Sequence, residues 1–329
     1  MTIIYVSIIS LGVLGVIYGL ILAFASKKFH VDINPKIEAI DNILPHANCG
    51  ACGYPGCSAY AEAVVEKGEE ITKCAPGGAA AVANISKILG VKASAKERKV
   101  AVLHCQSGGY TNTILRGEYQ GVKTCASAVM IAGGTNMCAY GCVGYNDCVA
   151  ACNFDALHVD ENGMRYVEND KCTGCGACVI ACPRNLIELV GISKKVHVLC
   201  SSNDKGVVAR KVCGSKTSCI ACGLCVKACK FDAIHIIDNL AVIDYEKCVS
   251  CGECAKVCPT KAIEDQLKGL RKVAFIEEDK CIGCTLCARV CPVDAIAGSI
   301  KQIHKVDPDV CIGCEACVAK CPKDAIKMV

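Results

Sequence analysis

Thirty-two of the 329 residues are cysteines, and most of them stand in runs of the form C-x2-C-x2-C-x3-C. In bacterial two-cluster ferredoxins this spacing lets a short loop place three thiolates on one iron–sulfur cube, while the fourth thiolate binds the neighbouring cube. The runs therefore predict [4Fe–4S] clusters and electron transfer. The five regular runs are Cys172, Cys175, Cys178, Cys182; Cys219, Cys222, Cys225, Cys229; Cys248, Cys251, Cys254, Cys258; Cys281, Cys284, Cys287, Cys291; and Cys311, Cys314, Cys317, Cys321.

Two other uses of cysteine fit the pattern less well. A disulfide framework is typical of small secreted domains, whereas these cysteines repeat in sets of four and four of the runs end in Cys-Pro. Zinc ribbons separate two Cys-x-x-Cys pairs by a long spacer and lack a third evenly spaced thiol. Soft thiolate ligands in this arrangement favour iron–sulfur clusters.

A different cysteine motif lies nearer the N-terminus, with the spacing C-x2-C-x4-C-x16-C. The glycines between its cysteines let the backbone pass close to a cluster, and the alanine-rich segment 58–66 is expected to form a helix. The motif predicts one self-contained [4Fe–4S] site. We expect His46 beside it to lie on the surface or next to the ligands rather than to bind iron. The four cysteines are Cys49, Cys52, Cys57 and Cys74.

A short signature, Cys followed by three residues and then Ala (Leu in one copy) and a branched residue, occurs six times. The small and branched residues are expected to pack against a cluster before a short strand begins. Because repeats of this kind pair, six copies predict three two-cluster units. The first copy is irregular, since its cysteines are more widely spaced. The copies start at Cys152, Cys182, Cys229, Cys258, Cys291 and Cys321.

The crossed ligation of two-cluster ferredoxins then assigns six ligand sets. The first unit has Cys138, Cys142, Cys148 with Cys182, and Cys172, Cys175, Cys178 with Cys152. The second unit has Cys219, Cys222, Cys225 with Cys258, and Cys248, Cys251, Cys254 with Cys229. The third unit has Cys281, Cys284, Cys287 with Cys321, and Cys311, Cys314, Cys317 with Cys291.

Four cysteines remain: Cys105, Cys125, Cys200 and Cys213. Cys105 and Cys200 each follow a β-branched stretch and precede a serine. Cys125 and Cys213 each precede a ferredoxin unit. Residues 101–191 thus resemble residues 195–266, as in an internal duplication. Two copies around a pseudo-twofold axis bring four thiols together, which predicts an eighth [4Fe–4S] cluster. The alternative is four free thiols, since free cysteine is among the most buried residue types.

The first residues of the chain are apolar. Residues 2–25 carry no charge and are long enough to cross a bilayer as a helix. Lys27 and Lys28 follow, and the positive-inside rule places the rest of the chain on the cytoplasmic side. The small residues around Phe24 suggest a cleaved signal peptide as the alternative. The length of the apolar run and the lack of a preceding Lys or Arg favour an uncleaved anchor.

Together these features predict an α+β chain of four parts. They are a transmembrane anchor at 1–26, a 4Fe–4S module at 27–90, a duplicated dicluster ferredoxin-like domain at 91–270 holding two units, and a C-terminal dicluster ferredoxin domain at 271–329. Little of the sequence indicates one continuous core, and small modules of this kind depend on bound metal. We therefore expect the cluster-free chain to be largely unfolded beyond its first few dozen residues.

The formal charge of +4 does not describe the loaded protein. Each cluster with its four thiolates adds about −2, so eight clusters bring the charge to about −12. Nucleic-acid binding is not expected, because no basic run is interleaved with aromatic residues. No nucleotide-binding or hydrolytic motif is present, so we expect no substrate-converting site in this chain.

An apolar N-terminal segment, the motif HANCGACGYPGC at 46–57 and a ferredoxin array together resemble the B subunit of Rnf complexes. The resemblance covers essentially the whole chain. It implies a subunit of an ion-translocating ferredoxin:NAD⁺ oxidoreductase at the bacterial cytoplasmic (inner) membrane. Such a subunit takes electrons from reduced ferredoxin and passes them to the other subunits, coupled to Na⁺ or H⁺ transport and to NAD⁺ reduction elsewhere in the complex. Many family members carry one two-cluster unit, whereas this sequence has three.

Two other functions remain open: an electron relay for another membrane complex, such as a hydrogenase or a redox-sensor reductase, and a storage or structural iron–sulfur protein. Within the relay, the N-terminal module is expected to deliver electrons to membrane partners, and the C-terminal unit to receive them from ferredoxin. Basic residues beside that unit could attract an acidic ferredoxin, although such residues often serve only solvation. They are Lys261, Lys268, Arg271, Lys272 and Lys280.

Overall fold

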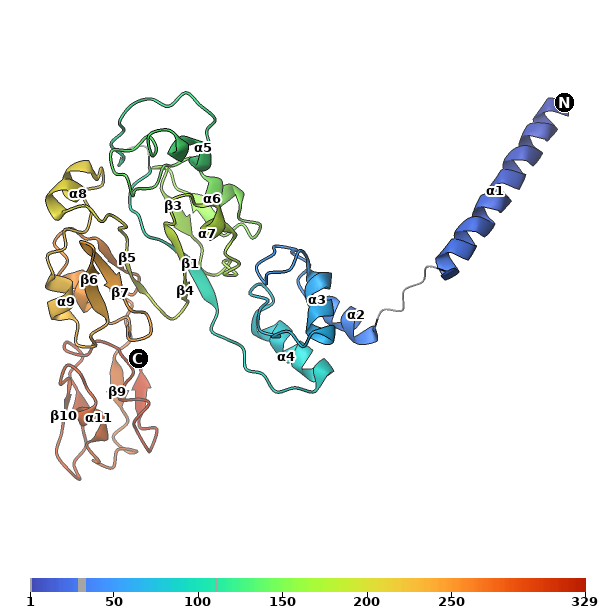
Figure 1. Ribbon diagram of the computed structural model, residues 1–329. Coiled ribbons are helices and arrows are strands. Elements are labelled where there is room, and N and C mark those ends of the chain that lie inside the picture. Colours follow the sequence, from blue (N-terminus) through green and yellow to red (C-terminus); the bar gives the residue numbers. More distant parts are fainter. Residues whose placement is uncertain (1, 29–33, 110–111) are drawn as a thin grey trace.

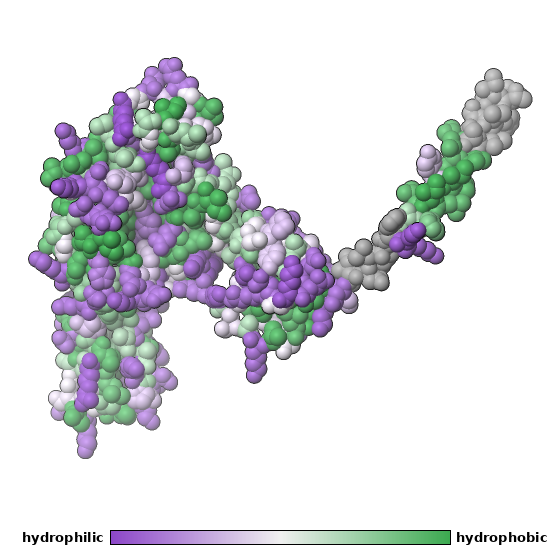
Figure 2. Space-filling model, in the orientation of Figure 1, coloured by the Kyte–Doolittle hydropathy of each residue, from purple (hydrophilic) through white to green (hydrophobic). Residues whose placement is uncertain are grey.

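The computed structural model of the chain describes residues 2–28, 34–109 and 112–329 (Figure 1). Helix α1 (Thr2–Lys28) ends in two lysines and lies apart from the other elements. Within the described residues, Leu11–Lys28 is the one helical stretch long and apolar enough to cross a membrane, with a mean hydropathy of 1.5. No part of this stretch is buried against the rest of the chain, and Figure 2 shows its apolar surface.

Three helices form the N-terminal module: α2 (Pro35–Asp41), α3 (Cys57–Glu66) and α4 (Gly78–Leu89). Helix α3 confirms the helix predicted at 58–66. Ile40, Tyr60 and Ile85 meet in a core where none is more than 1% exposed. The Tyr60 hydroxyl keeps its hydrogen bond there by donating to the carbonyl of Glu70, 2.8 Å away.

The rest of the chain repeats one arrangement of two antiparallel two-stranded sheets. In each repeat the first strand pairs with the last, and the middle two strands form a hairpin. The first repeat has β1 (Lys99–Leu103) with β4 (Ile187–Gly191), and β2 (Leu157–Val159) with β3 (Arg165–Val167). The second has β5 (Val196–Val198) with β8 (Ile263–Asp265), and β6 (Ile234–Ile237) with β7 (Leu240–Ile243). The third has β9 (Ala274–Ile276) with β12 (Ile326–Met328), and β10 (Ile296–Ala297) with β11 (Lys305–Val306).

Short helices carry the cysteine loops. Each is a single turn or two, so packing around the cysteines rather than helix propensity must hold it in place. They are α5 (Cys125–Met130), α6 (Asp147–Ala150), α7 (Ala177–Ala181), α8 (Gly206–Val212), α9 (Leu224–Ala228), α10 (Glu253–Lys256) and α11 (Leu286–Arg289).

The six signature copies have the predicted short strands after them, since β2, β4, β6, β8, β10 and β12 each begin at the branched residue of one copy. The residue two positions earlier has a positive φ of 48–55° in every copy, which turns the chain from the last cysteine into the strand. Asp and Asn, which tolerate this conformation, occupy five of the six positions. These residues are Asp155, Asn185, Asp232, Lys261, Asp294 and Asp324.

The buried apolar residues form separate clusters rather than one core, and each repeat has its own cluster that includes cysteines. The first two repeats also touch each other. His104 Nδ1 lies 2.7 Å from the carbonyl oxygen of Val198, and the hydroxyl of Ser201 donates to the carbonyl of His104 at 2.9 Å. The ends of β1 and β5 therefore lie side by side.

Candidate metal centres

Each regular cysteine run folds as a loop that reverses direction around its second cysteine. The residues immediately before and after that cysteine have positive φ in all five runs. Glycine fills most of these positions, but Ala221, Ser250, Thr285 and Glu315 adopt the same conformation at φ values of 53–62°. A side chain at positive φ costs free energy, so these loops must be held by other interactions. Closely spaced cysteines can provide such an interaction by binding metal.

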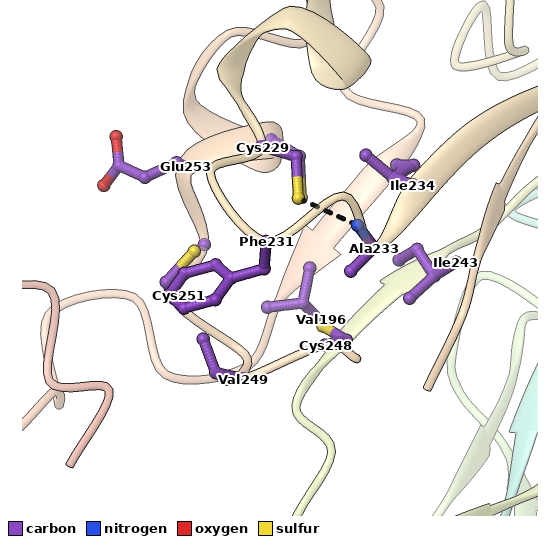
Figure 3. A pocket seen from close by; sticks show the side chains of 12 residues that line it. Val196, Cys229, Phe231, Ala233, Ile234, Ile243, Cys248, Val249, Cys251 and Glu253 are labelled. Atoms are coloured by element: carbon purple, nitrogen blue, oxygen red, sulfur yellow. Dashed lines mark hydrogen bonds between the residues drawn. The ribbon is translucent and has the colours of Figure 1, made fainter. Parts of the chain in front are cut away.

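Three hollows in the structure are each lined by one complete predicted ligand set. The sets are Cys152, Cys172, Cys175, Cys178; Cys229, Cys248, Cys251, Cys254; and Cys281, Cys284, Cys287, Cys321. In each hollow three cysteines come from one run and the fourth from its partner run, as crossed ligation requires. Figure 3 shows the second hollow, where Phe231, Val196 and Val249 close off the space around the cysteines.

Backbone N–H groups point at the sulfur of the last cysteine in a run. The N–H four residues later donates to that sulfur at 3.2–3.5 Å in five of the six signature copies. Figure 3 shows one of these bonds, from Ala233 to Cys229. In the sixth copy the Thr260 hydroxyl lies 3.7 Å from the sulfur of Cys258. Such donors stabilise negative charge on sulfur, which suits thiolates and reducible clusters.

In the N-terminal module the four predicted cysteines also meet. Cys74 is buried, and burial, followed by the nearby Cys57, Cys52 and Cys49, raises its pKa. The side chain of Asn48 accepts a hydrogen bond from the N–H of Cys57 at 2.9 Å and so fixes the start of α3. The side chain of His46 is 53% exposed, which agrees with a surface position.

Burial raises the pKa of many of these thiols. It brings Cys105, Cys148 and Cys254 to about 12, so that without a cation they stay protonated at neutral pH. A coordinating metal deprotonates such thiols, and thiolates in turn are the ligands that iron–sulfur clusters need. Among the described residues no three potential ligands come close enough for a single ion. A cube binds each thiolate through a different iron, which sets the sulfurs further apart.

A fourth hollow lies where the first two repeats meet, and its four cysteines differ from the predicted set. Cys105, Cys200 and Cys213 line it as predicted, but the fourth cysteine is Cys138. Cys125, the predicted fourth member, does not line it. The sequence analysis placed Cys138 in the irregular first run, where the longer loops obscured its position.

Cys125 lies instead beside the irregular run, at the first residue of α5. It packs against Val143, next to Cys142. The neighbouring thiols of Cys142, Cys125 and Cys182 add to burial in raising the pKa of Cys148. Cys125 thus lies near Cys142 and Cys148, beside which the sequence analysis had placed Cys138.

One basic residue near the C-terminal unit also differs from expectation. Arg271 is only 16% exposed and forms an ion pair with Asp265 at 2.8 Å, and it also donates to the carbonyl of Ser250. Its charge is therefore used inside the protein and is not part of a docking surface. Lys261, Lys268, Lys272 and Lys280 are exposed.

Comparison with protein families supports iron–sulfur binding along most of the chain. Models of 4Fe-4S dicluster domains match residues 171–233, 218–262 and 247–295, and another such model matches residues 274–328. A model of a putative Fe-S cluster matches residues 44–76. The predictions of a cluster module near the N-terminus and of dicluster ferredoxin domains after it are confirmed at this level.

Several curated proteins are similar over most of the chain. The B subunit of the Na⁺-translocating ferredoxin:NAD⁺ oxidoreductase complex of Acetobacterium woodii is 45% identical over 72% of this chain and 70% of its own length. The B subunit of an ion-translocating oxidoreductase complex of Methanosarcina acetivorans is 42% identical over 78% of this chain and 97% of its own. The B subunit of the proton-translocating ferredoxin:NAD⁺ oxidoreductase complex of Clostridium ljungdahlii is 39% identical over 72% and 83%.

Proposed function

Because this chain belongs to the family of B subunits of ion-translocating (Rnf) oxidoreductase complexes, we propose that it carries electrons from reduced ferredoxin to the membrane subunits of such a complex. The complex couples this transfer to Na⁺ or H⁺ movement and to NAD⁺ reduction on another subunit. The observation that carries the proposal is the set of hollows that are each lined by four cysteines from two crossed runs.

The chemistry supplied by each bound [4Fe–4S] cluster is the reversible uptake of one electron. The chain contributes three things to it. Thiolates hold the irons, backbone N–H groups such as that of Ala233 stabilise the added negative charge, and apolar side chains such as Val196 and Ile243 keep water away. Hydrogen bonds and solvent exclusion are the means by which a protein sets the reduction potential of a cluster.

We assign the clusters to an N-terminal module and three dicluster units that follow the sheet repeats at 99–191, 196–265 and 274–328. Thirty-two cysteines suffice for eight sets of four, so the proposal is eight clusters. The N-terminal module and the second and third units use the sets predicted from the sequence. In the first unit the set of Cys152, Cys172, Cys175 and Cys178 is also retained.

Helix α1 is the proposed membrane anchor, with the cluster domains on the cytoplasmic side of the inner membrane. Its last residues, Lys27 and Lys28, carry the positive charge that favours this orientation. In Figure 1 the N-terminal module lies between α1 and the ferredoxin-like repeats. This position supports an order in which the C-terminal unit receives electrons and the N-terminal module delivers them to the membrane partners.

Two measurements on the anaerobically purified full-length chain test the function. Iron and acid-labile sulfide should each approach about 32 per chain, and reduced ferredoxin should bleach the visible absorbance of the clusters rapidly. Replacing Lys268, Lys272 and Lys280 by Gln should slow this reaction and weaken its dependence on salt. The matched control replaces the exposed Lys87, Lys92 and Lys123, which lie outside the C-terminal unit.

Each outcome has a separate meaning. Little iron after anaerobic reconstitution contradicts the electron relay itself. A loaded chain that ferredoxin does not reduce contradicts ferredoxin as the donor. Equal slowing by both lysine triples contradicts docking at the C-terminal unit, because it shows only an effect of overall charge.

A further inference from the structure

The hollow between the first two repeats, called here the junction hollow, has a different lining from the other three. The hollow in Figure 3 is closed by apolar residues such as Val196, Ile234 and Ile243. The junction hollow is lined by four cysteines together with a shell of hydroxyl groups. These cysteines are Cys105, Cys138, Cys200 and Cys213, and the hydroxyls are those of Ser107, Tyr140, Ser201, Ser202, Ser215, Thr217 and Ser218.

Two of the cysteines occupy equivalent positions in the two repeats. Cys105 stands two residues after β1, and Cys200 stands two residues after β5. The sulfur of Cys105 accepts the N–H groups of Ser107 and Cys142, each at 3.3 Å. At Cys200, burial raises the pKa of the thiol and the backbone N–H groups of the equivalent residues, Ser202 and Cys219, act to lower it. The same local geometry thus aims two sulfurs at one space from opposite repeats.

The other two cysteines complete this pairing. Cys138 and Cys213 each precede the first cysteine of a run, Cys142 in one repeat and Cys219 in the other. The N–H of Gly141 donates to the carbonyl oxygen of Cys138 at 3.3 Å, and the sulfur of Cys213 lies 3.2 Å from the hydroxyl of Ser215. Each repeat therefore contributes two of the four thiols.

Cys125 is held at a different place. The carboxylate of Asp147 accepts the N–H of Cys125 at 2.9 Å and that of Ala126 at 3.1 Å. Because Asp147 immediately precedes Cys148, this bond ties the start of α5 to the loop of the irregular run. With Cys138 paired to Cys213, Cys125 is left as the counterpart of Cys222, the second cysteine of the regular run in the second repeat.

One polar atom in the junction hollow lacks a partner. Ser218 is 3% exposed, and its hydroxyl makes no hydrogen bond with any described residue. A buried hydroxyl without a partner costs free energy, so a native site normally supplies one. A cluster sulfur in the junction hollow is an acceptor that would satisfy it. This observation is independent of the cysteines and also indicates a ligand.

We propose that Cys105, Cys138, Cys200 and Cys213 bind one [4Fe–4S] cluster shared by the two repeats, and that Cys125 joins Cys142, Cys148 and Cys182 in the adjacent set. The assignment rests on the proposed electron relay and specifies how the relay continues from one repeat to the other. Neither repeat holds this site alone. The surrounding hydroxyls give it more hydrogen-bond donors than the apolar hollows have, which predicts a higher reduction potential than theirs.

Iron counting on pairs of variants in the full-length chain tests which cysteines share a cluster. Loss of any ligand from one cluster removes about four irons, and loss of two ligands of the same cluster still removes about four. We expect Cys138→Ala with Cys213→Ala to lose about four irons, and Cys125→Ala with Cys213→Ala to lose about eight. The matched control, Cys222→Ala with Cys213→Ala, should also lose about eight because these residues belong to different sets.

The outcomes separate this assignment from the general function. Wild-type protein with little iron contradicts the electron relay. Wild-type protein with a full complement, but with about eight irons lost from the Cys138 and Cys213 pair and about four from the Cys125 and Cys213 pair, contradicts the ligand assignment alone. Loss of iron from none of the variants at Cys105, Cys200 or Cys213 means free thiols and also overturns it.

If a cysteine variant loses more than its own cluster, a hydroxyl variant tests the cluster in the junction hollow instead. Ser218→Ala keeps every cysteine, so we expect unchanged iron content and a lower midpoint potential for a single cluster. Ser86→Ala is the control, since its hydroxyl donates to the carbonyl of Val82 in α4. Redox titrations monitored by electron paramagnetic resonance measure the shift. Unchanged potentials in Ser218→Ala contradict a cluster in the junction hollow.

Discussion

The two repeats at 99–191 and 196–265 have the same sheets but different cysteine loops. In the second repeat one short loop carries Cys219, Cys222 and Cys225 with two residues between neighbours. In the first repeat, α5 supplies Cys125 from a long segment that precedes Cys142 and Cys148. If the proposed ligand sets hold, the comparison teaches that a ligand can come from a distant part of the chain and still reach the equivalent position, provided that other side chains hold the longer loops.

Arg165 is the side chain that holds these loops. It lies opposite Val159 in the hairpin of the first repeat, where the second repeat has Ala241 opposite Ile236. It is 7% exposed, and its guanidinium donates to Asn146 and to the carbonyls of Gly108, Gly144 and Gly163. Gly144 and Asn146 lie within the irregular run, and Gly108 and Gly163 lie in the segments before and after it. The regular loop of the second repeat needs no such tie.

The largest expected effect comes from Arg165→Ala, which installs the residue of the second repeat. It leaves three buried or half-buried carbonyls without this donor, and we expect a loss on the order of 3 kcal/mol in the stability of the first repeat. Hydrogen exchange should increase in residues 112–146, and iron should be lost from the adjacent clusters. The amides of β5 to β8 should exchange as in wild type.

Arg98→Ala is the matched control for this change. Arg98 also donates to two backbone carbonyls of the first repeat, those of Asn169 and Asp170, but its side chain is exposed. We expect a loss of about 0.5 kcal/mol or less. Equal effects of the two arginine variants would mean that Arg165 does not hold the irregular loops.

A smaller effect is expected from Gly108→Ala. The backbone there has φ of +99°, and an added Cβ would lie 2.8 Å from the Cβ and 2.9 Å from the Sγ of Cys142. Positive φ and this overlap together should cost about 2 kcal/mol and displace Cys142. In Gly223→Ala of the second repeat, φ is +73° but no atom lies within 4 Å. That variant should cost about 1 kcal/mol and keep all its iron, which anaerobic iron analysis of the two variants checks. Iron loss from Gly223→Ala but not from Gly108→Ala would contradict this account.

The regular parts of the molecule were predictable from the sequence because their spacing is short. A run with two residues between cysteines has one way to fold around a cube, so three hollows contain the predicted sets. The strand after each signature follows for the same reason, since the cysteine, the turn residue and the strand are within five positions. The α3 helix was predictable from its composition.

The proposed exchange of Cys125 and Cys138 was not predictable by the same route. It depends on contacts between distant segments, such as Asp147 with the N–H of Cys125, and spacing within one run carries no information about them. A signal was nevertheless present. Three residues separate Cys148 from Cys152 and Cys225 from Cys229, so aligning the repeats from these pairs backward places Cys142 opposite Cys219 and Cys138 within two positions of Cys213. Nothing comparable in the sequence indicated that the side chains of Arg165 and Arg271 form their hydrogen bonds inside the protein.

The two repeats also differ at one buried position in their outer sheets. His197 in β5 lies opposite Glu264, and the equivalent residue in β1 is Val102, opposite Glu188. His197 is 1% exposed, and its Nδ1 lies 2.9 Å from the hydroxyl of Tyr245. Burial first, and then the nearby His104 and Lys195, lower the pKa of His197 from 6.5 to about 4. The second repeat thus buries a titratable group where the first has none.

This difference predicts that acid weakens the second repeat more than the first. Below pH 6.5 the unfolded chain binds a proton at His197 that the folded chain does not bind until about pH 4. Stability therefore falls as pH falls through this window, by up to about 1.4 kcal/mol for each pH unit. Hydrogen exchange of the β5 and β8 amides at pH 7.5 and pH 5.5, corrected for the intrinsic pH dependence of exchange, measures the slope. The amides of β1 and β4 serve as the internal reference.

Two variants separate the histidine from its partner. His197→Val gives the second repeat the residue of the first and should abolish the extra slope, even though the unpaired Tyr245 hydroxyl lowers stability at every pH. Tyr245→Phe removes the hydrogen bond but leaves the imidazole buried, so the slope should remain. If the stability of His197→Val kept the full pH slope, the acid sensitivity would not come from His197. It would have to come from groups that both repeats share, such as the thiolates.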